Sequence, residues 1–135
     1  VELSWRLHMR GSCLCGKVHY QINGKARSVV ACHCIQCRKT SGHHVAATQV
    51  EQLNLSVQGV EEITWYQSSE TAERGFCRTC GSQLFWKEFA STRISVMAGT
   101  LDGETGLVMD RQLFTDSKGD YYRLPNVEPV DQSAL

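Results

Sequence analysis

The chain has 135 residues, of which 41% are hydrophobic and 21% are charged, close to the averages of globular domains. A chain of this length buries roughly 65 to 70% of its unfolded surface, so one apolar core can hold it together without disulfide bonds. Its fourteen Lys and Arg residues are balanced by fourteen Asp and Glu residues, so no net positive charge attracts it to nucleic acid or to an anionic membrane.

The first residues show no sign of a membrane span or of a secretory signal. Residues 1–8 contain Glu2 and Arg6 and no long apolar run. We interpret residues 1–8 as an N-terminal extension or a remnant of cloning, residues 9–127 as a single domain, and residues 128–135 as a C-terminal tail.

Short stretches of alternating apolar and polar residues predict β-strands along most of the chain. The stretch Lys17–Ile22 places its apolar residues on one face, and Gln52–Val57 does the same with Leu53 among them. Further strands are predicted at Ser28–Ala31, His44–Val50, Glu62–Gln67, Gln83–Trp86 and Arg93–Met97. Many short strands without a long helical period indicate a mainly β fold.

One short helix is predicted over Ile35–Ser41, with Gly42 as its C-terminal cap. Cys34 and Cys37 would then lie at its first turn. The positive end of the helix favours thiolate over thiol, and the basic residues that follow Cys37 add positive charge nearby.

The last part of the chain, Asp110–Leu135, has few strand signals and contains both prolines. We expect it to form a loop-rich segment that packs against the sheet.

The seven cysteines cannot all pair in disulfides because their number is odd. Without a secretory signal we expect a reducing compartment, the cytoplasm, where clustered thiols usually bind metal. They form three clusters, which are Cys13 with Cys15, Cys32 with Cys34 and Cys37, and Cys77 with Cys80.

Two of these clusters have the form of zinc knuckles. A glycine follows the pair Cys13 and Cys15, and Gly81 follows the pair Cys77 and Cys80, where it supplies the positive φ that such a turn requires. Together the two pairs supply four thiolates to one zinc ion. Four thiolates fill the tetrahedral coordination of zinc, so the site that they form would be structural.

The remaining cluster consists of Cys32, Cys34 and Cys37. Three thiolates leave one coordination position of a zinc ion to water or to an incoming ligand, which is the pattern of a catalytic site.

Two alternative partitions remain open at this point. In the first, the stretches Cys34–Cys37 and Cys77–Cys80 form an ordinary zinc ribbon, which leaves Cys32 unexplained. In the second, a histidine closes the three-cysteine cluster, and the protein is a non-catalytic zinc-binding module that binds a protein partner. The candidate histidines are His33, His43 and His44.

Four stretches of the sequence resemble successive motifs of the glutathione-dependent formaldehyde-activating enzyme family, which also contains the centromere protein V domain. The stretches are Gly11–Tyr20, Ala31–Thr40, Phe76–Phe85 and Ala98–Asp102. The resemblance extends from about Met9 to Pro125. It implies a mainly β zinc-binding fold of stacked antiparallel sheets of short strands.

The resemblance also implies the metal ligands and the reaction. The implied structural zinc ligands are Cys13, Cys15, Cys77 and Cys80, and the implied catalytic zinc ligands are Cys32, Cys34 and Cys37. The implied activity is that of a carbon–sulfur lyase, which forms or cleaves a thiol–aldehyde adduct such as S-(hydroxymethyl)glutathione. The expected cofactors are two zinc ions, the second of them labile, with glutathione or another small thiol as co-substrate.

The expected mechanism depends on the open position of the second zinc. A free thiol has a pKa of roughly 8.5, and coordination to zinc removes its proton, so the thiol becomes a nucleophile toward an aldehyde. One of the three histidines is a candidate proton donor. A fourth thiolate would give the site two negative charges, which we expect nearby cations to offset. The candidate cations are Arg38, Lys39 and Arg78.

Overall fold

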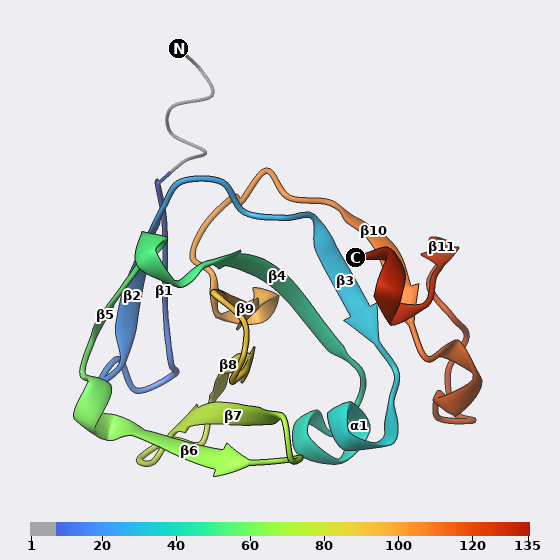
Figure 1. Cartoon of the computed structure of the whole chain (residues 1–135), viewed down its shortest axis with the longest axis horizontal. Helices are drawn as coiled ribbons and strands as arrows, with labels where there is room; N and C mark the ends of the chain where they lie inside the picture. Colours follow the sequence, from blue (N-terminus) through green and yellow to red (C-terminus); the bar gives the residue numbers. More distant parts are fainter. Residues whose placement is uncertain (1–7) are drawn as a thin grey trace.

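The computed structural model describes residues 8–135, and the predictions for residues 1–7 lie outside this range. Residues 8–135 form two β-sheets, one α-helix and five short 3-10 segments (Figure 1). The smaller sheet has the strand order β1–β2–β5, with bounds β1 His8–Ser12, β2 His19–Asn23 and β5 Leu55–Gln58.

The larger sheet has the strand order β11–β10–β3–β4–β9–β8–β7–β6. Its bounds are β3 Val29–Cys32, β4 Val45–Glu51, β6 Ile63–Gln67, β7 Ala72–Cys77, β8 Gln83–Glu88, β9 Arg93–Met97, β10 Met109–Leu113 and β11 Glu128–Pro129. The helix α1, Ile35–Ser41, connects β3 to β4. In residues 8–135 no helix combines the length and the apolar composition needed to cross a membrane.

The main core lies between the two sheets. Because side chains alternate between the faces of a strand, β2 turns Tyr20 and Ile22 toward this core, and β9 turns Ile94 and Val96 toward it. Their burial removes apolar surface from water, which contributes about 25 cal/mol per Å² to stability. The core therefore fixes the face of the larger sheet that points inward.

The opposite face of the larger sheet points away from this core and lines a cavity. On β4 it presents Val45, Ala47 and Gln49, and on β9 it presents Ser95 and Met97. The helix α1 lies at one end of this face, beside the ends of β3 and β4 and away from the three-stranded sheet (Figure 1). The helix therefore places its cysteines at this end of the face.

The predicted mainly β fold with one short helix is confirmed, and α1 has the predicted bounds. The helix ends at Gly42, whose φ of 83° is the left-handed conformation expected of a C-terminal cap. The structure contains strands near each of the other predicted positions.

Two sequence predictions were wrong in part. Residues Gln52–Asn54 form a 3-10 segment in which Leu53 is 87% exposed, so β5 begins only at Leu55. The segment Asp110–Leu135 overlaps the strand β10, which pairs in parallel with β3 and with β11, whereas the other strand pairs are antiparallel in the described part of the chain. Two parallel strands must be joined by a long crossover connection, so no local sequence pattern indicates that they pair.

Candidate metal centres

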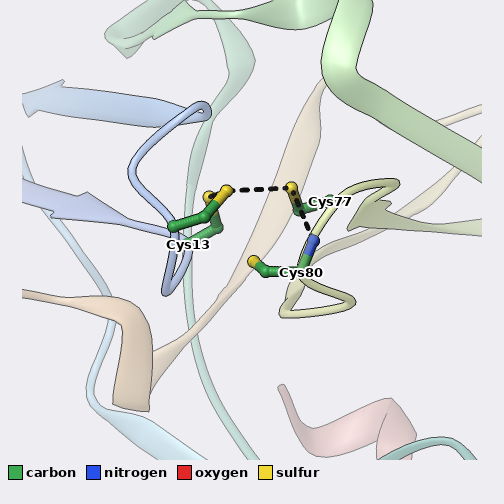
Figure 2. Close-up of side chains that lie close together, drawn as sticks. Cys13, Cys77 and Cys80 are labelled. Atoms are coloured by element: carbon green, nitrogen blue, oxygen red, sulfur yellow. Dashed lines mark hydrogen bonds between the residues drawn. The ribbon is translucent and has the colours of Figure 1, made fainter.

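Four sulfur atoms meet between the loop after β1 and the loop after β7 (Figure 2). The Sγ atoms of Cys13, Cys15, Cys77 and Cys80 all lie within 4.8 Å of one another. Cys15 Sγ lies 3.6 Å from Cys13 Sγ and 3.7 Å from Cys77 Sγ. Four sulfurs held tetrahedrally at the usual Zn–S distance of about 2.3 Å are roughly 3.8 Å apart, so this donor set fits zinc.

Backbone N–H groups prepare these sulfurs for a metal ion. The N–H of Val18 donates to Cys13 Sγ over 3.3 Å, and the N–H of Cys80 donates to Cys77 Sγ over 3.5 Å. Gly81 adopts a φ of 78° and its N–H donates to the Cys77 carbonyl, which closes the turn. Such donors stabilise negative charge on sulfur.

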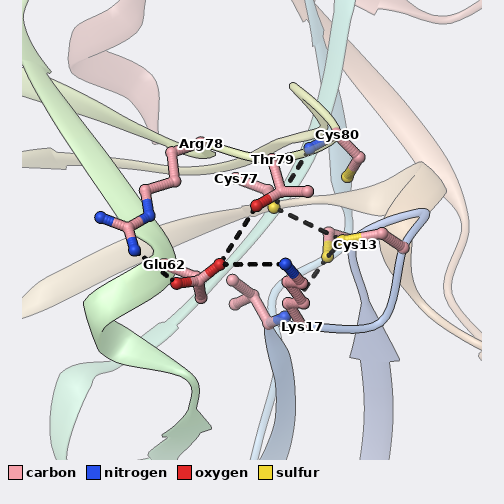
Figure 3. Close-up of polar contacts among 9 residues, drawn as sticks. Cys13, Lys17, Glu62, Cys77, Arg78, Thr79 and Cys80 are labelled. Atoms are coloured by element: carbon pink, nitrogen blue, oxygen red, sulfur yellow. Dashed lines mark hydrogen bonds and ion pairs between the residues drawn. The ribbon is translucent and has the colours of Figure 1, made fainter.

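Glu62 connects the two loops of this four-cysteine cluster (Figure 3). Its carboxylate accepts hydrogen bonds from Arg78 Nη2 over 2.9 Å and from Thr79 Oγ1 over 3.1 Å, and it lies 3.8 Å from Lys17 Nζ. The hydrogen bond from Thr79, followed by the charge of Arg78, lowers the pKa of Glu62. Glu62 therefore stays ionised and holds the loop of Lys17 against the loop of Thr79.

A second cluster of sulfurs forms where β3 leads into α1. The Sγ atoms of Cys32, Cys34 and Cys37 lie within 4.8 Å of one another. Cys34 is the N-cap of α1, and its sulfur accepts a hydrogen bond from the N–H of Cys37 over 3.3 Å. Hydrogen bonds from Cys32 and Cys37 hold the pKa of Cys34 well below its usual range. The hydrogen bond between Cys32 and Cys34 in turn raises the pKa of Cys32. The three sulfurs therefore form a compact set of donors, and the first turn of α1 directs one N–H toward it.

The three-cysteine cluster lies in the wall of a cavity of about 560 Å³. This cavity lies on the face of the larger sheet that points away from the main core, and its wall includes all three cysteines. Beyond the sulfurs the wall contains the cationic side chains Arg27, Arg74 and Arg93 and the aromatic rings Trp86 and Phe114. A cavity of this volume is large enough for a small organic molecule.

Arg74 is a cationic residue of the candidate site that the sequence did not reveal. Its guanidinium donates to Cys37 Sγ over 3.7 Å, and its positive charge lowers the pKa of Cys34 further. The cations expected from the sequence lie elsewhere, because Arg78 contacts Glu62 at the other cluster and Arg38 donates to the carbonyl of Ser117.

Lys39, the third expected cation, is not part of the cavity wall that contains the three cysteines. The alternation of Ala72, Arg74 and Phe76 could have indicated that Arg74 faces the same side as Ala72.

The histidines form a cluster of their own, packed against the C-terminal segment. His33 is buried, with Nδ1 2.6 Å from Tyr122 Oη and Nε2 3.0 Å from Gln112 Oε1. The rings of His43 and His44 lie 4.4 Å apart. Burial lowers the pKa of His33 and of His44, so both are held neutral.

Neither alternative partition of the ligands agrees with this geometry. Within residues 8–135, no histidine nitrogen joins the three sulfurs within 4.8 Å, and none of the three candidate histidines lines the cavity. The zinc-ribbon pairing fails because the stretch Cys77–Cys80 meets the first cysteine pair rather than Cys34–Cys37.

The fold and these clusters define a mainly β protein with two sulfur-rich candidate metal centres, one closed and one beside a cavity. The family model of the glutathione-dependent formaldehyde-activating enzyme matches residues 8–117. The chain therefore belongs to the glutathione-dependent formaldehyde-activating enzyme family.

Two individual proteins are also similar to the chain. A Schizosaccharomyces pombe protein named as an uncharacterized lyase is 32% identical over 120 residues, which cover 86% of this chain and 85% of the yeast protein. The crystal structure of a Rhodobacter sphaeroides protein superposes with a TM-score of 0.59 at 29% identity, and covers 75% of this chain and 98% of its own. Together with the family, the yeast relative supports a lyase-type or formaldehyde-activating role.

Proposed function

We propose that the protein is a zinc-dependent carbon–sulfur lyase that forms or cleaves S-(hydroxymethyl)glutathione or a closely similar thiol–aldehyde adduct. The supporting observation is the unequal division of the seven sulfurs. Four of them surround one point between two loops, whereas Cys32, Cys34 and Cys37 converge at the wall of the cavity. In this proposal the four-cysteine cluster holds a structural zinc and the three-cysteine cluster holds the catalytic zinc.

The proposed reaction adds a thiol to an aldehyde. When bound, the zinc ion supplies the Lewis acidity that lowers the pKa of the substrate thiol. A carbon–sulfur bond forms as the sulfur attacks the carbonyl carbon, the electron pair of the C=O bond moves to oxygen, and the proton lost by sulfur is replaced by one on oxygen. The three cysteines and the cavity wall position both reactants, which removes much of the entropic cost of their meeting.

Arg27 supports a thiol that carries a carboxylate, such as glutathione. The backbone N–H of Arg27 donates a hydrogen bond to the carbonyl of Gln49 on β4, whereas Cys32 pairs with Val45 of the same strand. The backbone of Arg27 therefore lies four residues along β4 from the cluster. At about 3.4 Å per residue this separation is roughly 14 Å. The cavity thus has sulfur at one end and Arg27 toward the other, and its wall also includes Glu88.

The guanidinium of Arg27 is suited to bind an anion. Burial, followed by the charges of Arg111 and Arg93, lowers its pKa. Its Nη2 donates to the carbonyl of Ala47 over 3.2 Å, and no carboxylate in residues 8–135 lies within 4.0 Å of it. A substrate carboxylate would supply the missing counter-charge through charge-assisted hydrogen bonds.

The proposal includes the compartment as well. Seven free thiols persist where glutathione and thioredoxin keep cysteines reduced, as in the cytoplasm.

The substitution Cys34→Ser tests the proposed function. Serine is itself a good N-cap, so α1 should persist while one ligand of the three-cysteine cluster is lost. We expect turnover of glutathione with formaldehyde, corrected for the spontaneous reaction, to fall to the background rate. The thermal unfolding midpoint is measured in parallel. Unchanged turnover in a folded Cys34→Ser variant would reject the proposed function.

A further inference from the structure

A buried arginine stands beside the three-cysteine cluster without a carboxylate partner. Arg74 lies on β7 and is only 6% exposed. No carboxylate of residues 8–135 lies within 4.0 Å of its guanidinium. A buried charge is costly unless an opposite charge and hydrogen bonds compensate it. Arg74 therefore needs an anion that no acidic residue of this part of the chain provides.

The contacts of Arg74 point to sulfur as that anion. Its Nη2 donates to Cys37 Sγ over 3.7 Å and to Gln36 Oε1 over 3.3 Å. Gln36 is held in turn, because its Nε2 donates to the carbonyl of Ser68 over 3.1 Å. The helix α1 thus supplies both the sulfur that receives the positive charge and the amide that orients it.

The guanidinium also has donors to spare. Its Nε is buried and has no hydrogen-bond partner within residues 8–135. Its Nη1 likewise makes no hydrogen bond in this range, and Arg74 lines the cavity. An arginine has five N–H donors, so several remain for an anion bound next to the three sulfurs.

We propose that Arg74 is the counter-cation of the three-cysteine centre and lets it hold a zinc ion together with an anionic ligand such as a thiolate. Three thiolates and Zn²⁺ together carry one negative charge, and a bound thiolate raises this to two negative charges. The positive charge of Arg74 brings the net charge back to one negative charge. The inference rests on the proposed metal site, and it assigns the compensation to a residue outside the cysteine motifs.

Zinc affinity tests this role without any assay of turnover. Zinc alone is titrated in competition with a chromogenic chelator into the wild type, Arg74→Met and Arg74→Lys. Methionine keeps much of the length and packing of the side chain but removes the charge, whereas lysine keeps the charge. We expect Arg74→Met to weaken the weaker zinc site about 10- to 100-fold, with Arg74→Lys close to the wild type.

A matched control comes from the residue that directly follows β7. Arg78 is an exposed arginine that pairs with Glu62 beside the four-cysteine cluster. Arg78→Met should leave the affinity of the weaker site unchanged. The tighter site serves as the internal check on folding, because it needs both sheets in place, and it should stay loaded in each variant.

A second variant covers the case in which Arg74→Met does not fold. Gln36→Leu removes the amide that orients Arg74 but leaves the buried charge in place. We expect a smaller loss of affinity at the weaker site and no change at the tighter one.

The outcomes separate the two proposals. Wild-type affinity in a folded Arg74→Met variant, or equal losses in Arg74→Met and Arg74→Lys, would overturn the role of Arg74. A wild type that binds two zinc ions but does not turn over glutathione and formaldehyde would reject the proposed function and leave the Arg74 comparison valid. A wild type that binds one zinc ion would overturn both.

Discussion

The four-cysteine cluster and the three-cysteine cluster use the same donor atom but different lengths of chain. The first joins Cys15 to Cys77, 62 residues apart, and so ties the small sheet to the large one. The second lies within residues 32–37, at the end of one strand and the start of one helix. A cross-link that closes a long loop constrains the unfolded chain far more than one that closes a short loop.

The two clusters also differ in what surrounds them. The four sulfurs lie within 4.8 Å of one another and are enough in number for the tetrahedral coordination of zinc, and the nearby charges of Glu62 and Arg78 satisfy each other. The three sulfurs face a cavity and a buried Arg74. A cysteine cluster built across the fold favours stability, whereas a cluster built within one segment can have an open ligand position without endangering the fold.

The largest expected effect is the loss of stability in Cys77→Ser. Cys77 is fully buried, and its loss opens the cluster that joins the two sheets. Loss of a structural metal ligand belongs to the small class of substitutions that cost about 4 kcal/mol or more. Urea unfolding of the zinc-loaded protein measures the change, with Cys34→Ser as the matched substitution. Similar losses in the two variants would contradict the division of roles.

The next effect is a difference in the rate of zinc release. A chelator should remove the zinc of the three-cysteine centre first, about 100-fold faster than the other, because the cavity admits the chelator and one position lacks a protein ligand. Release is followed with a zinc-sensitive dye. Two zinc ions that leave in a single phase would favour two structural sites.

A smaller effect is expected at the end of the cavity that contains Arg27. Arg27→Gln removes the proposed partner of the substrate carboxylate, so the KM for glutathione should rise about tenfold, with little change in kcat. Cysteamine, a thiol without a carboxylate, should be unaffected. Arg111→Gln is the control, because Arg111 already pairs with Asp110 and is outside the cavity wall. An unchanged KM for glutathione would exclude Arg27 from substrate binding.

The smallest effect concerns acid. Burial lowers the pKa of His44, so near the ordinary value of about 6.5 the unfolded chain binds more protons than the folded one. Its contribution to stability is thus complete above that pH and declines as the pH falls below it. The free energy of unfolding at pH 7.5 and 5.5 should differ less in His44→Gln than in the wild type.

His19 provides the control for this measurement. It is exposed on β2, far along the chain from the histidine cluster, so His19→Gln should keep the wild-type difference between the two pH values. An equal pH response in His44→Gln and the wild type would contradict the expected proton uptake.

Much of the fold could be predicted from local patterns. The bounds of α1 followed from Gly42, and the grouping of the cysteines followed from their spacing. The strands β7 and β10 escaped prediction for different reasons. In β7 a charged residue occupies a buried position, and β10 is defined by its parallel pairing with the distant β3.

The sequence did not reveal the most informative parts of the candidate site. Arg74 is buried on the face of the larger sheet where its guanidinium contacts Gln36 and Cys37 of α1, about 37 residues away in the chain. His33 and His43 are close to the cysteines in sequence, yet they lie within hydrogen-bond distance of Tyr122 and Tyr121 instead. Both outcomes depend on long-range packing, which spacing along the chain does not encode.

The N-terminal cap of α1 gives a way to watch the second metal centre. Cys34 Sγ accepts the N–H of Cys37, so the atom that begins the helix is also one of the proposed ligands. Occupation of the centre should therefore be recorded in the first turn of α1, where amide hydrogen exchange would slow on loading and quicken on loss. A backbone signal could then report an ion that is itself spectroscopically silent.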